Sequence, residues 1–365
     1  MNTCKKCRGV GGLTKLKRVI AAVQQREPDR VPVVPQITYA TAHFAGVKFS
    51  DGLKDPQTMA RSLVEGFRLA GYDGVYVGWE SSFDLVAEAM GCELDVKPDE
   101  IPVVRERAVK NKKDVKLLRA VDPESSGRIP IHLKAIELVR EEIGPDVPIF
   151  RYVPGPLTLV SVLMGPEKAL MNLIKDPSFI RQALEPATES TLRFAAAAVK
   201  HGSDIVVVAD PMASSTVISP RMFKEFAYPT LCQVVEMIAE VGGIPSLHIC
   251  GKTEAILEEM TRTGAKILEL DHSVDLAAAK AEVGTRVCIQ GNLNPTGVLL
   301  TGEPKDVEAE SRACIEKASE EGGFILSSGC EIPLNAPLEN IKAMVSAAKR
   351  FGVYRDVQEL ENEGE

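Results

Sequence analysis

The chain has 365 residues, of which 45% are hydrophobic and 26% charged, and these proportions are ordinary for a soluble globular protein. Its formal net charge of −8 argues against nucleic acid as a partner, because contact with phosphates needs a surplus of Lys and Arg. No run approaches the roughly 20 consecutive apolar residues of a membrane span, so no membrane association is expected.

The beginning of the chain is polar and lacks the apolar centre of a signal peptide. We therefore expect a cytoplasmic protein whose eight cysteines remain reduced thiols. Cys4 and Cys7 stand among Lys and Gly residues with no second cysteine pair nearby, so residues 1–12 are expected to be a flexible tail. A single domain is expected over 13–355, with an insertion near 81–126.

Short β-rich runs alternate with longer helical patterns through this domain. The expected helices are Leu13–Gln25, Pro56–Ala70, Ile131–Ile143, two segments covering Pro166–Lys200, Pro220–Val241, Thr253–Arg262, Leu276–Val283, Pro304–Glu320 and Pro337–Phe351. The expected strands are Val31–Tyr39, Asp73–Gly78, Pro148–Val153, Asp204–Asp210, Ile244–Cys250, Ala265–Asp271, Arg286–Gly291 and Gly323–Ser328.

Apolar strands that alternate with helices require parallel crossovers. Eight such units predict an α/β protein, a (β/α)8 TIM barrel with an N-terminal helical extension. A doubly wound dinucleotide-binding sheet is disfavoured, because no Gly-rich phosphate turn follows the first strand. The charged run Arg105–Lys116 predicts a solvated surface within the insertion.

A His-x-Cys pair and a distant cysteine carry the clearest chemical signal. His248 and Cys250 lie two residues apart, and Cys330 follows in a separate segment. Imidazole with two thiolates is a ligand set that selects zinc, and three protein ligands leave a fourth position open for a substrate. The alternative is that both cysteines are small buried side chains and that the histidine is satisfied in the core.

The positions of these residues favour the zinc site. In barrels of this type the active residues lie at the carboxyl ends of the strands. His248 and Cys250 end the fifth expected strand, where a spacing of two puts them on one face, and Cys330 follows the eighth. Further polar residues occupy equivalent places, since Asp210 and Asp271 end their expected strands and Glu80 and Asn292 follow theirs.

From about Thr14 to Phe351 the chain resembles the uroporphyrinogen decarboxylase superfamily, and within it the zinc-dependent methylcobamide:coenzyme M methyltransferases. The segments that carry the resemblance are Asp29–Val33, Ala209–Ser214, His248–Gly251, Gly291–Pro295, Gly329–Pro333 and Ala336–Asn340. The resemblance implies that His248, Cys250 and Cys330 hold Zn²⁺. It also implies methyl transfer between a cobamide (methylcobalamin), presented by a corrinoid partner protein, and a thiol or other small acceptor.

Roles for the other residues follow from their positions in this scheme. Asp210 is the candidate for orienting the substrate or a zinc ligand, with Asn292 as its hydrogen-bonding neighbour. Glu80, Asp271 or Glu331 is expected to complete the zinc shell when the thiol is absent. The expected walls of the pocket include Tyr39, Arg151 and Tyr152.

Three alternatives remain open. The same site could pass a methyl group from a methylated donor to the corrinoid, as a demethylase component. A uroporphyrinogen decarboxylase would need arginines to grip its substrate's carboxylates, and residues 36–44 contain none. A non-catalytic corrinoid carrier would need an Asp-x-His-x-x-Gly motif, which the run after Asp271 does not form.

Overall fold

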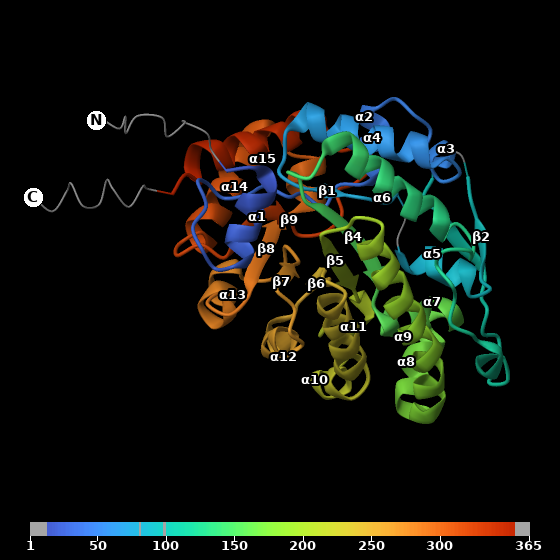
Figure 1. The fold of residues 1–365 in the computed structure, drawn as a ribbon. Helices are drawn as coiled ribbons and strands as arrows, with labels where there is room; N and C mark the ends of the chain where they lie inside the picture. Colours follow the sequence, from blue (N-terminus) through green and yellow to red (C-terminus); the bar gives the residue numbers. More distant parts are fainter. Residues whose placement is uncertain (1–12, 80–81, 98–99, 355–365) are drawn as a thin grey trace, which may run out of the picture.

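Seven apolar runs of the chain form one curled parallel sheet, and helices cover it (Figure 1). The computed structural model describes residues 13–79, 82–97 and 100–354. Neighbouring strands of the sheet follow chain order, and each pair is parallel. The strands are β1 (Val75–Tyr76), β4 (Ile149–Pro154), β5 (Ile205–Ala209), β6 (Ile244–Ile249), β7 (Ile267–Leu270), β8 (Cys288–Leu293) and β9 (Phe324–Ser328).

The helices alternate with these strands, as the sequence predicts. The α-helices are α1 (Lys15–Val23), α2 (Tyr39–Phe44), α3 (Phe49–Gly52), α4 (Pro56–Ala70), α5 (Ser82–Ala89), α6 (Ile129–Ile143), α7 (Pro156–Met164), α8 (Pro166–Lys175), α9 (Pro177–Lys200), α10 (Pro220–Met222), α11 (Tyr228–Glu240), α12 (Leu257–Arg262), α13 (Leu276–Val283), α14 (Pro304–Ala318) and α15 (Leu338–Phe351). Short 3₁₀ or π turns are η1 (Asp114–Leu117), η2 (Pro211–Ala213), η3 (Phe223–Ala227), η4 (Glu254–Ile256) and η5 (Pro295–Leu300).

The first expected strand, Val31–Tyr39, is wrong as a regular strand. Only an isolated parallel bridge forms there, between Val33 and Leu326 of β9. Pro32 and Pro35 have no backbone N–H, so a continuous ladder cannot form across this segment. The other end of the expected strand is also wrong, because α2 already begins at Tyr39.

This segment nevertheless bridges the two ends of the sheet. The Val34 amide donates to the Leu326 carbonyl of β9 at 2.9 Å, and the Asp73 amide donates to the Val33 carbonyl at 2.7 Å. Asp73 lies just before β1. The two edges of the sheet are thus joined through residues 33 and 34.

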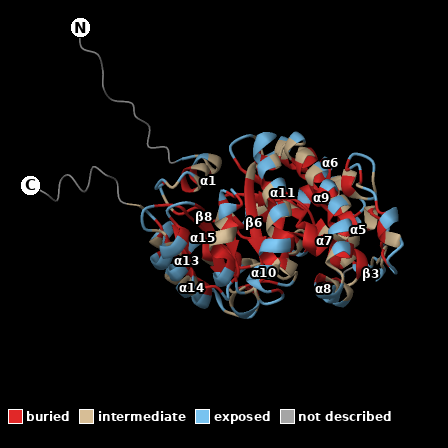
Figure 2. Ribbon diagram, turned by 90° about the horizontal axis from the view of Figure 1, so that it is seen from below, coloured by how far each residue is buried: buried red, intermediate tan, exposed pale blue. Residues whose placement is uncertain are grey.

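Two layers of apolar side chains pack on either side of the strands. The inner cluster contains Val34, Tyr76, Phe150, Ile205, Val207, Ile267, Cys288 and Ile325, together with Val19 and Ala22 of α1. The larger cluster lies between the sheet and the helices. Figure 2 shows the strands buried and the outer faces of the helices exposed.

The expected insertion contains structure of its own. Within it, α5 is followed by a two-stranded antiparallel sheet, β2 (Glu93–Asp95) and β3 (Val103–Glu106), and then by η1. The charged run Arg105–Lys116 is largely exposed, as the sequence predicts, but Val109 and Val115 anchor it in the core. The expected flexible tail at 1–12 lies outside the described residues.

Among the described residues, no single helix has the length and apolar character needed to cross a membrane. The pair α7 and α8 passes that test together, but the two helices are bent by 111° to each other. Most of α7 is buried inside the protein.

A buried cluster of charges ties α1 to the beginning of β1. The Asp73 carboxylate is fully buried and accepts hydrogen bonds from Arg18, Arg30 and the Val33 amide at 2.8–3.0 Å. Arg18 also forms a two-point contact with Asp29. Burial alone would raise the pKa of Asp73, but the hydrogen bonds and charge of Arg30 outweigh it and lower the pKa.

We predict that Asp73→Asn destabilises the protein by about 3–5 kcal/mol, because it leaves two partly buried guanidinium groups without their carboxylate. The midpoint of urea unfolding measures the loss. The control is Glu142→Gln, which breaks the exposed Arg68–Glu142 ion pair and should change stability by less than about 1 kcal/mol. Equal effects of the two variants would contradict this account.

The contribution of Asp73 should also depend on pH. An aspartate in the unfolded chain titrates near pH 4, and the folded-state pKa of Asp73 lies lower. Its stabilising effect is therefore complete above about pH 4 and is lost as the pH falls through the folded-state value. The difference in unfolding free energy between wild type and Asp73→Asn should shrink below pH 4. A constant difference between pH 7 and pH 3 would contradict the prediction.

Candidate metal centre

The structure brings together the three residues of the His-x-Cys and cysteine pattern. Their ligand atoms all lie within 4.8 Å of one another. His248 Nε2 is 3.0 Å from the Cys250 sulfur, which is 3.7 Å from the Cys330 sulfur. His248 lies in β6, Cys250 directly follows this strand, and Cys330 follows β9 after Gly329. A spacing of two along an extended strand puts the first two side chains on the same face.

Glycine allows the third residue to approach. The Gly329 amide donates to the Leu293 carbonyl at 2.7 Å, which continues the pairing of β8 with β9 to the residue just before Cys330. A Cβ atom at position 329 would lie 2.3 Å from the backbone nitrogen of His272. Only glycine fits this close approach of two backbones, so Gly329 sets the position of Cys330.

The orientation of the histidine ring follows from its backbone contact. His248 Nδ1 lies 3.2 Å from the Glu269 carbonyl oxygen on β7. A carbonyl oxygen only accepts hydrogen bonds, so Nδ1 carries a proton, and in the neutral ring Nε2 presents its lone pair toward the two sulfur atoms. This is the arrangement that histidines bound to metals adopt.

The pKa values of the three groups shift in different directions. Burial would lower the pKa of His248, but the neighbouring Cys330 and Glu269 raise it to about 9. The pKa of Cys250 is lowered by its hydrogen bond with Cys330, whereas that hydrogen bond and burial raise the pKa of Cys330. The three side chains bring one nitrogen and two sulfur donors together, and this donor set fits zinc with one coordination position left open.

A small cavity of about 100 Å³ lies beside the two thiols. Among its lining residues are Tyr39, Arg151 and Tyr152, the three that the sequence predicts as pocket walls. The remaining lining residues are Gln36, Thr38, Val77, Gly78, Ser82, Phe83, Ala209, Pro211, His248, Cys250, Cys330 and Glu331. A pocket of this size admits a small substrate at the thiols.

Arg151 reaches this cavity from the outer side of β4. Its side chain is buried, donates to the Val77 carbonyl at 2.7 Å and lies over the ring of Phe194 at 5.0 Å. A Cβ atom on Gly78 would collide with its guanidinium group. The absence of a side chain at Gly78 therefore makes room for Arg151.

Glu331 lines the cavity but is engaged elsewhere. One of its carboxylate oxygens accepts from the Thr38 amide and hydroxyl at 2.7 and 2.8 Å, and from the Tyr39 amide at 3.2 Å. It thus satisfies the amides at the beginning of α2. Burial raises the pKa of Glu331 to about 8, against the opposing effect of these donors.

Asp210, a predicted catalytic residue, lies outside the lining of this cavity. Its fully buried carboxylate accepts from the amide and hydroxyl of Thr158 at 2.8 and 2.5 Å and from the Leu157 amide at 3.3 Å, at the beginning of α7. Burial raises the pKa of Asp210 to about 6, although these hydrogen bonds oppose the shift. Gly155 leaves room for this side chain, because a Cβ atom there would lie 2.1 Å from the Cβ atom of Asp210.

Asn292 and Asp271 also lie outside the lining of this cavity. Asn292 was expected to follow its strand, but it lies inside β8. Its side-chain amide donates to the carbonyls of Asp271 and Val274 at 3.0 and 2.9 Å. The Asp271 carboxylate accepts from the Ser273 amide at 2.8 Å and pairs with His272. Glu80 lies outside the described residues. The functional roles of Asp210, Asn292, Asp271 and Glu80 stay predictions.

Glu269, which lies in the middle of β7, was not among the site residues predicted from the sequence. Its carboxylate is fully buried and accepts from the hydroxyls of Tyr76 and Ser246, both at 2.9 Å. It also lies 4.0 Å from His248 Nδ1. Burial raises the pKa of Glu269, while His248 and the hydroxyl donors oppose that effect. The signal was present in the sequence as a lone acid inside an otherwise apolar strand, Ile267–Leu270.

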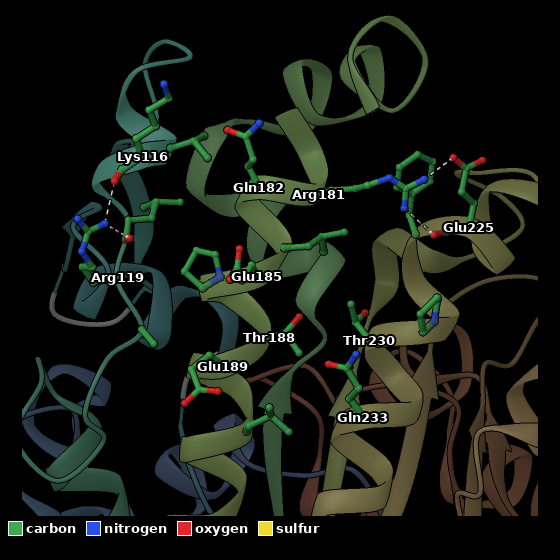
Figure 3. A pocket seen from close by; sticks show the side chains of 18 residues that line it. Lys116, Arg119, Arg181, Gln182, Glu185, Thr188, Glu189, Glu225, Thr230 and Gln233 are labelled. Atoms are coloured by element: carbon green, nitrogen blue, oxygen red, sulfur yellow. Dashed lines mark hydrogen bonds and ion pairs between the residues drawn. The ribbon is translucent and has the colours of Figure 1, made fainter. Parts of the chain in front are cut away.

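A larger groove of about 930 Å³ lies on the outer wall of the protein between α9 and α11, beside the η1 segment (Figure 3). The ion pair of Arg181 with Glu225 joins α9 to η3 at this groove. It shares no lining residue with the cavity beside the thiols.

Comparison with known proteins identifies the family of the chain. A family model described as uroporphyrinogen decarboxylase (URO-D) matches residues 14–351. A methylcobamide:CoM methyltransferase MtaA from Methanosarcina barkeri is 32% identical over 340 residues, which cover 92% of this chain and 97% of that protein. A methylcobamide:CoM methyltransferase MtbA from Methanosarcina mazei is 30% identical over 93% of this chain and 98% of its own length.

The fold comparison leads to the same group of proteins. A solved structure described as a methyltransferase from Methanosarcina mazei superposes with a TM-score of 0.84 at 31% sequence identity, covering 93% of this chain and 99% of that chain. The sequence match extends through both strands that carry the three clustered ligands. The chain belongs to the uroporphyrinogen decarboxylase (URO-D) family.

Proposed function

We propose that this chain is a zinc-dependent enzyme that transfers a methyl group between a methylated corrinoid, carried by a partner protein, and a thiol. The observation that carries the proposal is the convergence of His248, Cys250 and Cys330 within 4.8 Å beside a small cavity. The names of the methyltransferase relatives, which cover nearly the whole chain, point to the same chemistry.

Each residue of the centre has a defined part in this proposal. His248 Nε2 and the thiolates of Cys250 and Cys330 would hold the ion, and the hydrogen bond from His248 Nδ1 keeps the ring turned toward it. Bound zinc would supply Lewis acidity that lowers the pKa of a substrate thiol. Asp271, Glu331 or Glu80 is proposed to complete the shell when no thiol is present.

The cavity would align the thiol and limit the entry of water. Tyr39, Tyr152 and Arg151 form part of its wall. In the overall reaction the thiolate sulfur bonds to the methyl carbon, the cobalt–carbon bond breaks with its electron pair left on cobalt, and the thiol proton passes to solvent. Alignment of this kind is a major source of rate enhancement. Asp210 and Asn292 are proposed to act indirectly, through the segments that they hold in place.

Uroporphyrinogen decarboxylation is the less favoured function for this member of the family. Gln36, Thr38 and Tyr39 face the cavity, and residues 36–44 contain no arginine to pair with substrate carboxylates. A decarboxylase of that kind would also leave the His–Cys–Cys cluster without a role. The reverse methyl transfer, from a methylated thiol to the corrinoid, uses the same groups and stays open.

The proposal also covers the type of barrel and the cellular compartment. We infer a (β/α)8 barrel in which residues 31–36 occupy the first strand position and α1 is an N-terminal extension. The backbone bonds of Val33 and Val34 to both neighbours support this assignment. The six cysteines among the described residues are free thiols, which suits a reducing compartment such as the cytoplasm.

We predict that the purified protein contains about one zinc ion per chain and that His248→Ala and Cys330→Ser lose it, because each variant removes one of three protein ligands. Elemental analysis of protein prepared without chelator measures the content. Cys232→Ser, which changes a half-buried thiol on α11, is the matched control and should retain zinc. Absence of zinc from the wild type would overturn the proposed function.

We predict that the protein demethylates methylcobalamin when 2-mercaptoethanesulfonate is added, with cob(I)alamin formation followed by absorbance. Cys250→Ser should lower the rate by about 100-fold or more, since even the partners of metal ligands are worth 10–100-fold. Cys232→Ser again serves as the control. If the zinc-loaded wild type transferred methyl groups in neither direction, while consuming uroporphyrinogen, the decarboxylase function would replace the proposed one.

A further inference from the structure

A fully buried carboxylate lies beneath the metal centre, and neither the sequence pattern nor the proposed reaction assigns it a role. Glu269 occupies the middle of β7, directly opposite His248 in the parallel ladder with β6. The side chain of Glu269 is fully buried. An acid in such a place is costly unless hydrogen bonds and a nearby positive charge compensate for lost hydration.

Two hydroxyl groups beside Glu269, those of Tyr76 and Ser246, point their hydrogens toward it. Gln290 Nε2 donates to the Tyr76 hydroxyl at 2.7 Å, so that hydroxyl in turn donates to Glu269 Oε1 at 2.9 Å. The Ser246 hydroxyl donates to the same oxygen at 2.9 Å. Donors of this kind stabilise the ionised form of a carboxyl group.

The other carboxylate oxygen faces the histidine. Glu269 Oε2 lies 4.0 Å from His248 Nδ1, and the backbone oxygen of the same residue lies 3.2 Å from that nitrogen. The Tyr152 hydroxyl, which lines the cavity, is 3.4 Å from Oε2 and donates to Gln36 at 2.8 Å. Glu269 thus contacts both a proposed metal ligand and the wall of the substrate cavity.

We propose that Glu269 is a positioning residue of the metal centre, where its backbone oxygen fixes the His248 ring and its carboxylate strengthens the binding of a divalent cation by His248, Cys250 and Cys330. The inference rests on the proposed function in that it assumes a cation at these three residues. A carboxylate behind a metal-binding imidazole increases the basicity of that ligand.

The variant that tests the carboxylate is Glu269→Gln, which keeps the size of the side chain and an oxygen for the two hydroxyl donors. Its dissociation constant for zinc, measured by competition with a chromophoric chelator, should rise by about 10–100-fold. Ser246→Ala removes one of the donors but keeps the acid, and its zinc affinity should remain within about threefold of wild type.

The outcomes separate this inference from the proposed function. A folded Glu269→Gln protein that binds zinc as tightly as wild type overturns the role of the carboxylate and leaves the proposed function intact. Equal losses in Glu269→Gln and Ser246→Ala overturn it as well, because a general disturbance of the core would then explain both. A wild-type protein that binds no zinc overturns the proposed function itself.

A second measurement does not depend on whether the variant folds. Nitrogen NMR of zinc-loaded wild-type protein labelled at histidine, with only five histidines to resolve, reports the state of each ring nitrogen. His248 should show a protonated Nδ1 and a metal-bound Nε2, and its signals should be missing from His248→Ala. Metal bound to Nδ1 would overturn the assignment of Glu269 as the residue that fixes the ring.

Discussion

The parallel register between β6 and β7 is the constraint on which the metal centre depends. It sets His248 opposite Glu269, so that one residue of β7 offers both a backbone oxygen and a carboxylate to the same imidazole. A shift of one residue would turn His248 and Cys250 together to the opposite face of the sheet, away from Cys330, because side chains alternate across a strand. The ladder that builds the sheet therefore also selects the nitrogen that faces the sulfur atoms.

Two buried acids in this protein are compensated in different ways. Asp73 is surrounded by guanidinium groups and joins the segment before β1 to α1. Glu269 is surrounded mainly by hydroxyl groups and has an imidazole as its nearest potential cation. In the first arrangement the guanidinium groups neutralise the charge of Asp73 at all times, as expected for a residue with a structural role. The second leaves negative potential beside the thiols, where a cation would compensate it.

Much of the fold and the central cluster could be predicted from the sequence. The apolar runs located seven strands, and a spacing of two placed His248 and Cys250 on one face. The β-rich composition of residues 31–39 suggested a regular first strand. That prediction failed because Pro32 and Pro35 have no backbone N–H to donate to a ladder. The periodicity of a sequence reports burial and gives little information about which backbone hydrogen bonds are made.

Individual polar residues were harder to interpret. Asp210 and Asn292 lie near the ends of strands, as active residues do, yet their side chains bond to backbone groups of neighbouring segments. Sequence position alone does not distinguish a helix cap from a residue that faces a cavity. Glu269 was missed for the opposite reason, because a strand interior gives no expectation of a functional acid.

The separation of the ligands along the chain has a consequence for unfolding. Cys250 and Cys330 are 80 residues apart in sequence, and the segment between them contains β7, β8 and β9. An ion held by both would act as a reversible cross-link that closes this loop. A closed loop of that length lowers the conformational entropy of the unfolded chain relative to the same chain without the ion. The last three strands of the sheet would then resist local opening for as long as the cross-link is in place.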